Sequence, residues 1–136
     1  KQFGLRTPHS YHVAWADIDN DGDLDLMSSG KLFRNPGFGS CWLKVRVEGG
    51  VGSNRAAIGA RVTVVAGERK QIREISGGNS GNQNPLLLHV GLGNWLPTKQ
   101  VDVEVRFPSG KCLATQATPC STITVSEKDA VEPPLR

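Results

Sequence analysis

The sequence predicts an all-β fold, a jelly-roll-like β-sandwich with a β-hairpin at its N-terminal end. Hydrophobic and polar residues alternate with a period of two through most of the readable segments, which is the pattern of strands with one face in a core. No stretch of about a dozen residues has the i, i+3, i+4, i+7 hydrophobic spacing of an amphipathic helix. The 16 glycines and 8 prolines among 136 residues indicate many turns.

The alternation is clearest in residues 42–48, where Leu43, Val45 and Val47 are separated by charged residues. Residues 101–107 repeat the pattern with three valines and a phenylalanine. Further strands are expected at 61–66, 71–75, 86–90, 111–113 and 122–126, with tight turns at 67–70 and 108–110. Together these strands supply enough alternating faces for a two-sheet core.

Charge and hydropathy exclude several classes of protein. Sixteen basic and thirteen acidic residues give a formal net charge of +3, which is too small to indicate a nucleic-acid partner by itself. The longest apolar runs hold a handful of residues, far below the ~20 needed to cross a bilayer, so no membrane span is expected. Residues 1–10 also lack the apolar stretch of a signal peptide.

Five of the thirteen acidic residues lie within nine positions near the N-terminus and require a counterion. They are Asp17, Asp19, Asp21, Asp23 and Asp25. The spacing DxDxDGxxD places carboxylates on a tightly curved loop, with Gly22 at the bend, and Ca²⁺ prefers such oxygen ligands. We expect side-chain ligation by the first three aspartates, a backbone carbonyl from the fourth, and closure of the shell by the fifth. The alternative is a solvated acidic turn without metal.

The flanks of this motif exclude an EF-hand. An EF-hand loop ends in a bidentate glutamate at its twelfth position, where this chain has Ser28, and it lies between helices. Residues 11–15 and 24–27 instead have the composition of strands. The sequence therefore predicts a calcium loop within a β-hairpin.

Three cysteines leave the disulfide state open. Cys112 and Cys120 are eight residues apart and could close a small loop, whereas Cys41 is distant in sequence. We predict a Cys112–Cys120 disulfide, with three buried thiols as the alternative. No CxxC or Cys/His spacing supports a zinc site.

The polar segment 76–85 is long enough to be a binding loop. Its candidate ligand residues are Asn79, Asn82 and Gln83, together with Trp95 on another loop, although a tryptophan in such a fold is more often a packing residue. No GxSxG motif or nucleophile-base pair indicates an enzyme, and His89 lies in an apolar segment typical of a core.

Two family resemblances rest on these motifs. Residues 14–26, which contain the aspartate motif, resemble the calcium loop of an FG-GAP/VCBS repeat, the unit of integrin-type propellers. Residues 53–62, 73–78, 88–93 and 103–111 resemble the ASPIC/UnbV domain in sequence and in order. The resemblance implies an extracellular or cell-surface module that follows FG-GAP repeats, and it implies no enzymatic activity.

From these observations we expect three regions: a partial FG-GAP/VCBS-like hairpin at 1–38, an ASPIC/UnbV-like sandwich at 39–126, and a C-terminal arm at 127–136. A lone propeller fragment leaves strand edges unpaired. We therefore expect a non-catalytic calcium-binding structural module that self-associates as a homopolymer by strand exchange. The alternative is an adhesion module for glycans or other extracellular proteins.

Overall fold

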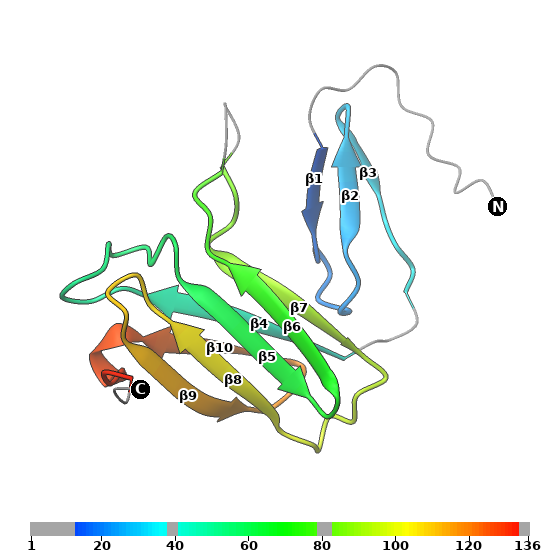
Figure 1. Cartoon of the computed structure of the whole chain (residues 1–136). Coiled ribbons are helices and arrows are strands. Elements are labelled where there is room, and N and C mark those ends of the chain that lie inside the picture. The colour runs from blue at the N-terminus through cyan, green and yellow to red at the C-terminus, as the bar shows by residue number, and fades with distance from the viewer. Residues whose placement is uncertain (1–12, 38–40, 79–82, 134–136) are drawn as a thin grey trace. The chain divides into compact units, whose positions relative to one another are not determined.

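A computed structural model describes residues 13–37, 41–78 and 83–133 and confirms the all-β prediction (Figure 1). Within these ranges the helical structure is a 3-10 turn, η1 (Glu127–Asp129). The chain divides into two compact units, Lys1–Ser40 and Cys41–Arg136, which are described separately.

The N-terminal unit contains a three-stranded antiparallel meander. Its strands are β1 (Val13–Ala16), β2 (Asp25–Ser28) and β3 (Lys31–Phe33), in the order β1-β2-β3. Ser29 and Gly30 connect β2 to β3 with positive φ angles of 51° and 72°, as a two-residue hairpin turn requires. Residues 17–24, which include four of the five clustered aspartates, form the longer connection from β1 to β2.

The second unit is a sandwich of two sheets. One sheet has the order β10-β4-β7 and the other the order β6-β5-β8-β9. The strands are β4 (Cys41–Glu48), β5 (Arg61–Ala66), β6 (Arg69–Glu74), β7 (Leu87–Gly93), β8 (Val101–Arg106), β9 (Cys112–Ala117) and β10 (Ser121–Ser126). All neighbours pair antiparallel except β10 and β4, which run parallel.

The core lies between the two sheets and follows from the alternation in the sequence. Leu43, Val45 and Val47 of β4 face inward and are at most 4% exposed, as predicted. Val103 and Val105 of β8 face them from the opposite sheet. Each buried Val or Leu contributes about 1.5–3 kcal/mol, so these two strands form a main part of the driving force for folding.

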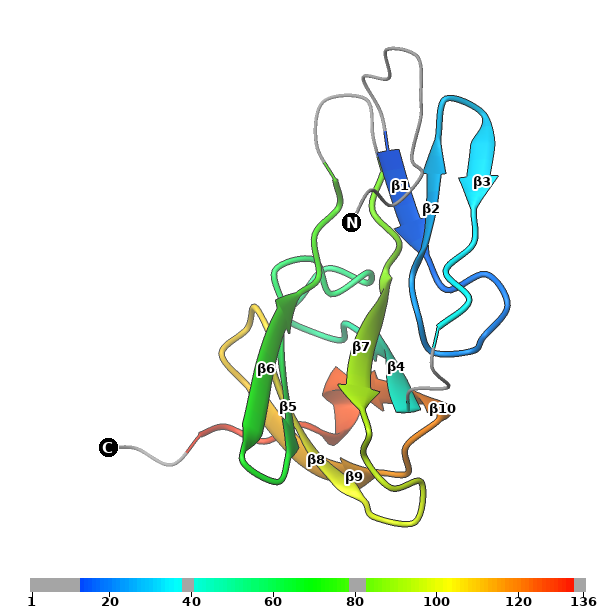
Figure 2. The ribbon, with the colours of Figure 1, turned by 90° about the vertical axis from the view of Figure 1, so that its right-hand side faces the viewer.

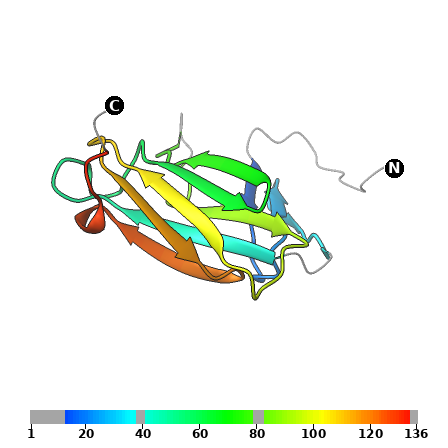
Figure 3. The same ribbon diagram turned by 60° about the horizontal axis from the view of Figure 1, so that its bottom comes forward.

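The open sides of the sandwich differ. On one side β6 and β7 lie near each other, where Gln71 Nε2 donates to the Gly91 carbonyl (2.7 Å), as Figure 2 shows for the two strands. On the other side a short connection joins β9 of one sheet to β10 of the other (Figure 3).

Residues 127–131 do not form the separate arm that the sequence predicted. η1 follows β10 directly, and Val131 forms an antiparallel bridge with Cys112 at the start of β9. The two hydrogen bonds of this bridge measure 2.9 Å and 3.0 Å. This segment is therefore attached to the sandwich.

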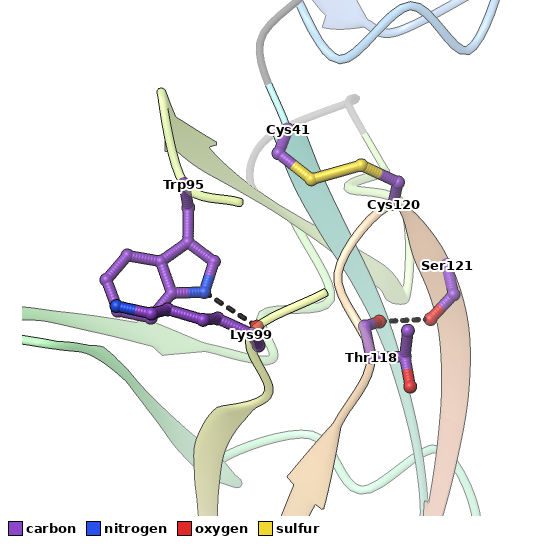
Figure 4. Close-up of a disulfide and its surroundings, with 6 residues drawn as sticks. All are labelled: Cys41, Trp95, Lys99, Thr118, Cys120 and Ser121. Carbon is purple, nitrogen blue, oxygen red and sulfur yellow. Dashed lines mark hydrogen bonds between the residues drawn. A yellow bond between two sulfur atoms is a disulfide. The ribbon is translucent and has the colours of Figure 1, made fainter. Parts of the chain in front are cut away.

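The predicted Cys112–Cys120 disulfide is wrong. Cys120 is bonded to Cys41 (Figure 4), with a Cα–Cα distance of 5.4 Å. Cys112 is a free thiol. Cys112 is the first residue of β9 (Cys112–Ala117) and Cys120 comes after the other end of that strand, so an extended segment rather than a compact loop separates them. Cys41 meets Cys120 because β4 and β10 start at the same end of their sheet.

Candidate functional site

The acidic loop is built by two residues with positive φ. Asn20 (61°) and Gly22 (97°) turn the chain sharply between β1 and β2. Glycine adopts this conformation without strain, and asparagine does so more readily than most residues. The bend turns alternate aspartates toward one point.

Three of the five predicted ligands meet there. Single carboxylate oxygens of Asp17, Asp19 and Asp21 all lie within 4.8 Å of one another. Both carboxylate oxygens of Asp17 are shielded from solvent. Asp21 Oδ1 also accepts a hydrogen bond from the Asp23 backbone N–H (2.9 Å), and Asp19 forms an ion pair with Arg34, a residue that the sequence reasoning did not single out.

The other two aspartates have different surroundings. Asp25 is 1% exposed, and its two oxygens accept hydrogen bonds from the backbone N–H groups of Ile18 (3.2 Å) and Asn35 (2.8 Å). This carboxylate holds the loop to the segment after β3. Asp23 lies against Gly37, where a Cβ atom would overlap its carboxylate.

The donor set suits a hard divalent cation. Ca²⁺ takes six to eight oxygens at about 2.3–2.6 Å, and three converging carboxylates offer up to six. Without a cation the same carboxylates repel one another, and Arg34 offsets part of that charge. The residues present therefore fit calcium, with Asp17, Asp19 and Asp21 as the side chains placed to hold it.

The sheet that carries this loop leaves its hydrophobic residues uncovered. None of the hydrophobic residues in 13–37 is buried, whereas Asp25 and Ser28 are. The strand register aligns Trp15, Leu26 and Phe33 in one row across the sheet. This row, together with neighbouring residues, lines a hollow of about 440 Å³.

The candidate ligand residues of the sandwich are only partly described. Asn79 and Asn82 lie outside the described residues, and Gln83 is exposed. Trp95 packs partly against the core, and its indole N–H donates to the Lys99 carbonyl (2.8 Å), as Figure 4 shows. The Lys99 ammonium lies 5.7 Å from the centre of the ring.

Trp95 nevertheless borders a surface hollow of about 480 Å³. Its polar lining includes Glu68, Arg69 and Asn94. The Trp95 ring therefore packs against the core on one side and remains at the surface on the other.

A buried carboxylate that the sequence reasoning missed organises one end of the sandwich. Glu127 is 2% exposed and accepts hydrogen bonds from the Gly50 backbone N–H, the Ser53 hydroxyl (2.9 Å) and the Ser109 hydroxyl (2.5 Å). The Ser109 bond most strongly, then those from Gly50 and Ser53 and the charge of Lys111, hold the pKa of Glu127 below its usual 4.5, against the effect of desolvation.

In the sequence, the one indication that Glu127 is buried is its position after a strand. An acid directly after the alternating strand 121–126 can be inward-facing, but its partners come from two loops more than fifteen residues away in sequence. Nothing local in the sequence indicates that they meet.

Comparison with protein families places the fold. The family described as ASPIC and UnbV matches residues 50–132, which cover most of the sandwich. The chain therefore belongs to the ASPIC and UnbV family. Comparisons with curated proteins and with solved structures found no significant match. In the described ranges, no helix is long and apolar enough to cross a membrane.

Proposed function

We propose that this chain is a non-catalytic, extracellular structural module that binds Ca²⁺ in its N-terminal loop and self-associates through its N-terminal unit. The observation that carries the proposal is the combination of converging carboxylates with a sheet that has no buried hydrophobic residue in 13–37. The disulfide favours an oxidising compartment such as the extracellular space.

Calcium binding would order the loop from which β1 and β2 extend. Asp17, Asp19 and Asp21 would hold the ion as in an FG-GAP/VCBS repeat, which residues 14–26 resemble. Asp25, through its two hydrogen bonds from the Ile18 and Asn35 backbone N–H groups, joins the end of the loop to its start and to the segment after β3. An ion that binds the folded loop alone stabilises it by mass action.

The apolar surface of the sheet supports self-association. Val13 and Trp15 are 58% and 55% exposed, and Met27 on the opposite face is 50% exposed. A sheet with apolar residues on both faces is stabilised when another β layer covers it. Among the described strands β1 lies at the edge of its sheet, with β2 as its partner on one side, so a strand from a second copy can extend the sheet.

Strand exchange assigns the donor role to residues 1–10, which lie outside the described residues. The C-terminal residues are less suited, because Val131 already pairs with Cys112 of its own chain. We therefore propose that the N-terminal segment of one copy adds to the exposed edge of another.

Light scattering with size-exclusion chromatography tests this assembly. In millimolar calcium, the full chain should elute as oligomers, and the deletion of residues 1–10 should elute as monomer. An unchanged oligomer after that deletion contradicts strand donation. Trp15→Ser tests association through the face of the sheet separately, and Ile72→Ser, at an apolar residue of β6 with similar exposure, is the matched control.

The hollow at Trp95 supports a second candidate function, adhesion to glycans or surface proteins. An aromatic ring beside Asn, Glu and Arg side chains offers stacking together with hydrogen bonds to hydroxyl groups. A glycan array with wild type and Trp95→Ala tests it. Binding that disappears in the variant supports adhesion, and an array without binding in calcium contradicts it.

A further inference from the structure

We propose that the sandwich is a load-bearing link whose resistance to stretching is set by the Cys41–Cys120 disulfide. This inference goes beyond the proposed binding and assembly, because it concerns tension transmitted along a single chain. It rests on where the chain enters and leaves the sandwich, and on which two strands those points belong to.

The chain enters the unit at Cys41, the first residue of β4, and its last strand is β10, which is followed by η1 and the short bridge of Val131 to Cys112. These two strands are neighbours and run parallel, with Ser121 opposite Leu43 and Ser126 opposite Glu48. Tension between the chain ends therefore pulls the start of β4 and the end of β10 in opposite directions. All hydrogen bonds of the pair then bear the load together, in shear, rather than one after another.

The disulfide changes the path of that tension. It joins the start of β4 to the residue that immediately precedes β10, across a sequence separation of 79. Force that enters at Cys41 then crosses to Cys120 and follows β10 to its end. The residues between the two cysteines lie outside this path.

The part of the chain that still carries the tension can hardly be extended further. β10 is a strand and already spans about 3.3 Å per residue, close to the limit of about 3.3–3.6 Å for a fully extended chain. Sliding of β10 along β4 is prevented because their adjacent starts are covalently joined. With the disulfide intact, tension cannot lengthen the segment from Cys41 to Ser126 by unfolding it.

The exit from β10 is also anchored. Glu127 is held by Gly50, Ser53 and Ser109, and Val131 is bridged to Cys112. These contacts add a short extension when they release, since they involve the few residues after Ser126. They do not open the sandwich.

Single-molecule stretching of the full chain, tethered at both ends in chelator, tests the proposal. The oxidised wild type should show no long unfolding step. Cys120→Ser should show an added step of about 27 nm, because a 79-residue separation extends at roughly 3.4 Å per residue. Cys112→Ser is the matched control and should behave as the wild type, because Cys112 is a free thiol.

If Cys120→Ser does not fold, wild type folded with its disulfide and then reduced by dithiothreitol gives the same comparison, since Cys120 is exposed. A step of about 27 nm in the oxidised wild type overturns the proposed force path. A reduced chain that lengthens without a resolved step overturns the shear resistance of β4 and β10. Because a single tethered chain is measured without calcium, neither result depends on assembly or metal binding.

Discussion

The Ser109 hydroxyl donates a 2.5 Å hydrogen bond to the buried carboxylate of Glu127 and so fastens the turn between β8 and β9 to η1. The same carboxylate holds the loop after β4 through Gly50 and Ser53. Three segments that are distant in sequence therefore depend on one charged group.

Glu127→Gln should lower the Tm at neutral pH, because the amide replaces a charged acceptor of three hydrogen bonds. The pKa of Glu127 is lowered on folding, so its stabilisation is fully present above the usual value of 4.5 and is lost as the pH falls through the folded value. Thermal melts from pH 7 to pH 3 should show the Tm difference shrinking in acid. A Tm difference that does not vary with pH contradicts this assignment.

Loss of the Cys41–Cys120 disulfide should cost about 4.5 kcal/mol of unfolding free energy, from the chain entropy of a loop of this length. Urea unfolding of the Cys41→Ser/Cys120→Ser double variant measures it. Cys112→Ser should change the stability little. Thiol titration of the native chain should find one free thiol, and peptide mapping that links Cys112 to Cys120 would contradict the structure.

Leu43→Ala should reduce the unfolding free energy by about 2–5 kcal/mol, because Leu43 is fully buried between the sheets. Val51→Ala is the control, with a side chain 96% exposed and an expected change within about 0.5 kcal/mol. Equal effects in urea unfolding would mean that the sheet does not face the core as described.

Asp25→Ala should loosen the acidic loop, because the backbone N–H groups of Ile18 and Asn35 lose the carboxylate that accepts their hydrogen bonds. Each such charged hydrogen bond contributes about 1.5–3 kcal/mol. Hydrogen exchange should accelerate at these two amides, and Glu104→Ala on the exposed face of β8 should leave them unchanged. Unchanged protection in Asp25→Ala would show that other contacts hold the loop.

The strands of the sandwich could be predicted because their information is local. Alternation in β4 and β8 reports directly which face each residue occupies. The disulfide could not be predicted this way, since the parallel pairing of β4 with β10 joins the two ends of the domain. The sequence spacing favoured Cys112, but an extended strand separates it from Cys120.

The candidate metal loop shows the same division. The DxDxDGxxD spacing and Gly22 predicted the bend, and three aspartates converge there. The separate surroundings of Asp25 depend on Asn35, which arrives only after β3 has folded back. Similarly, Asp19 forms an ion pair with Arg34, the residue after β3, and the aspartate motif does not encode this contact.

Isothermal titration calorimetry with Ca²⁺ tests whether the acidic loop of this chain holds the ion. The full chain should bind Ca²⁺ at one site. Calcium at a hundredfold excess over Kd should raise the free energy of unfolding by about 2.7 kcal/mol relative to chelator. Asp19→Ala should abolish both signals, and Glu104→Gln should retain them. No binding heat, together with identical melting in calcium and in chelator, would contradict calcium binding by the acidic loop.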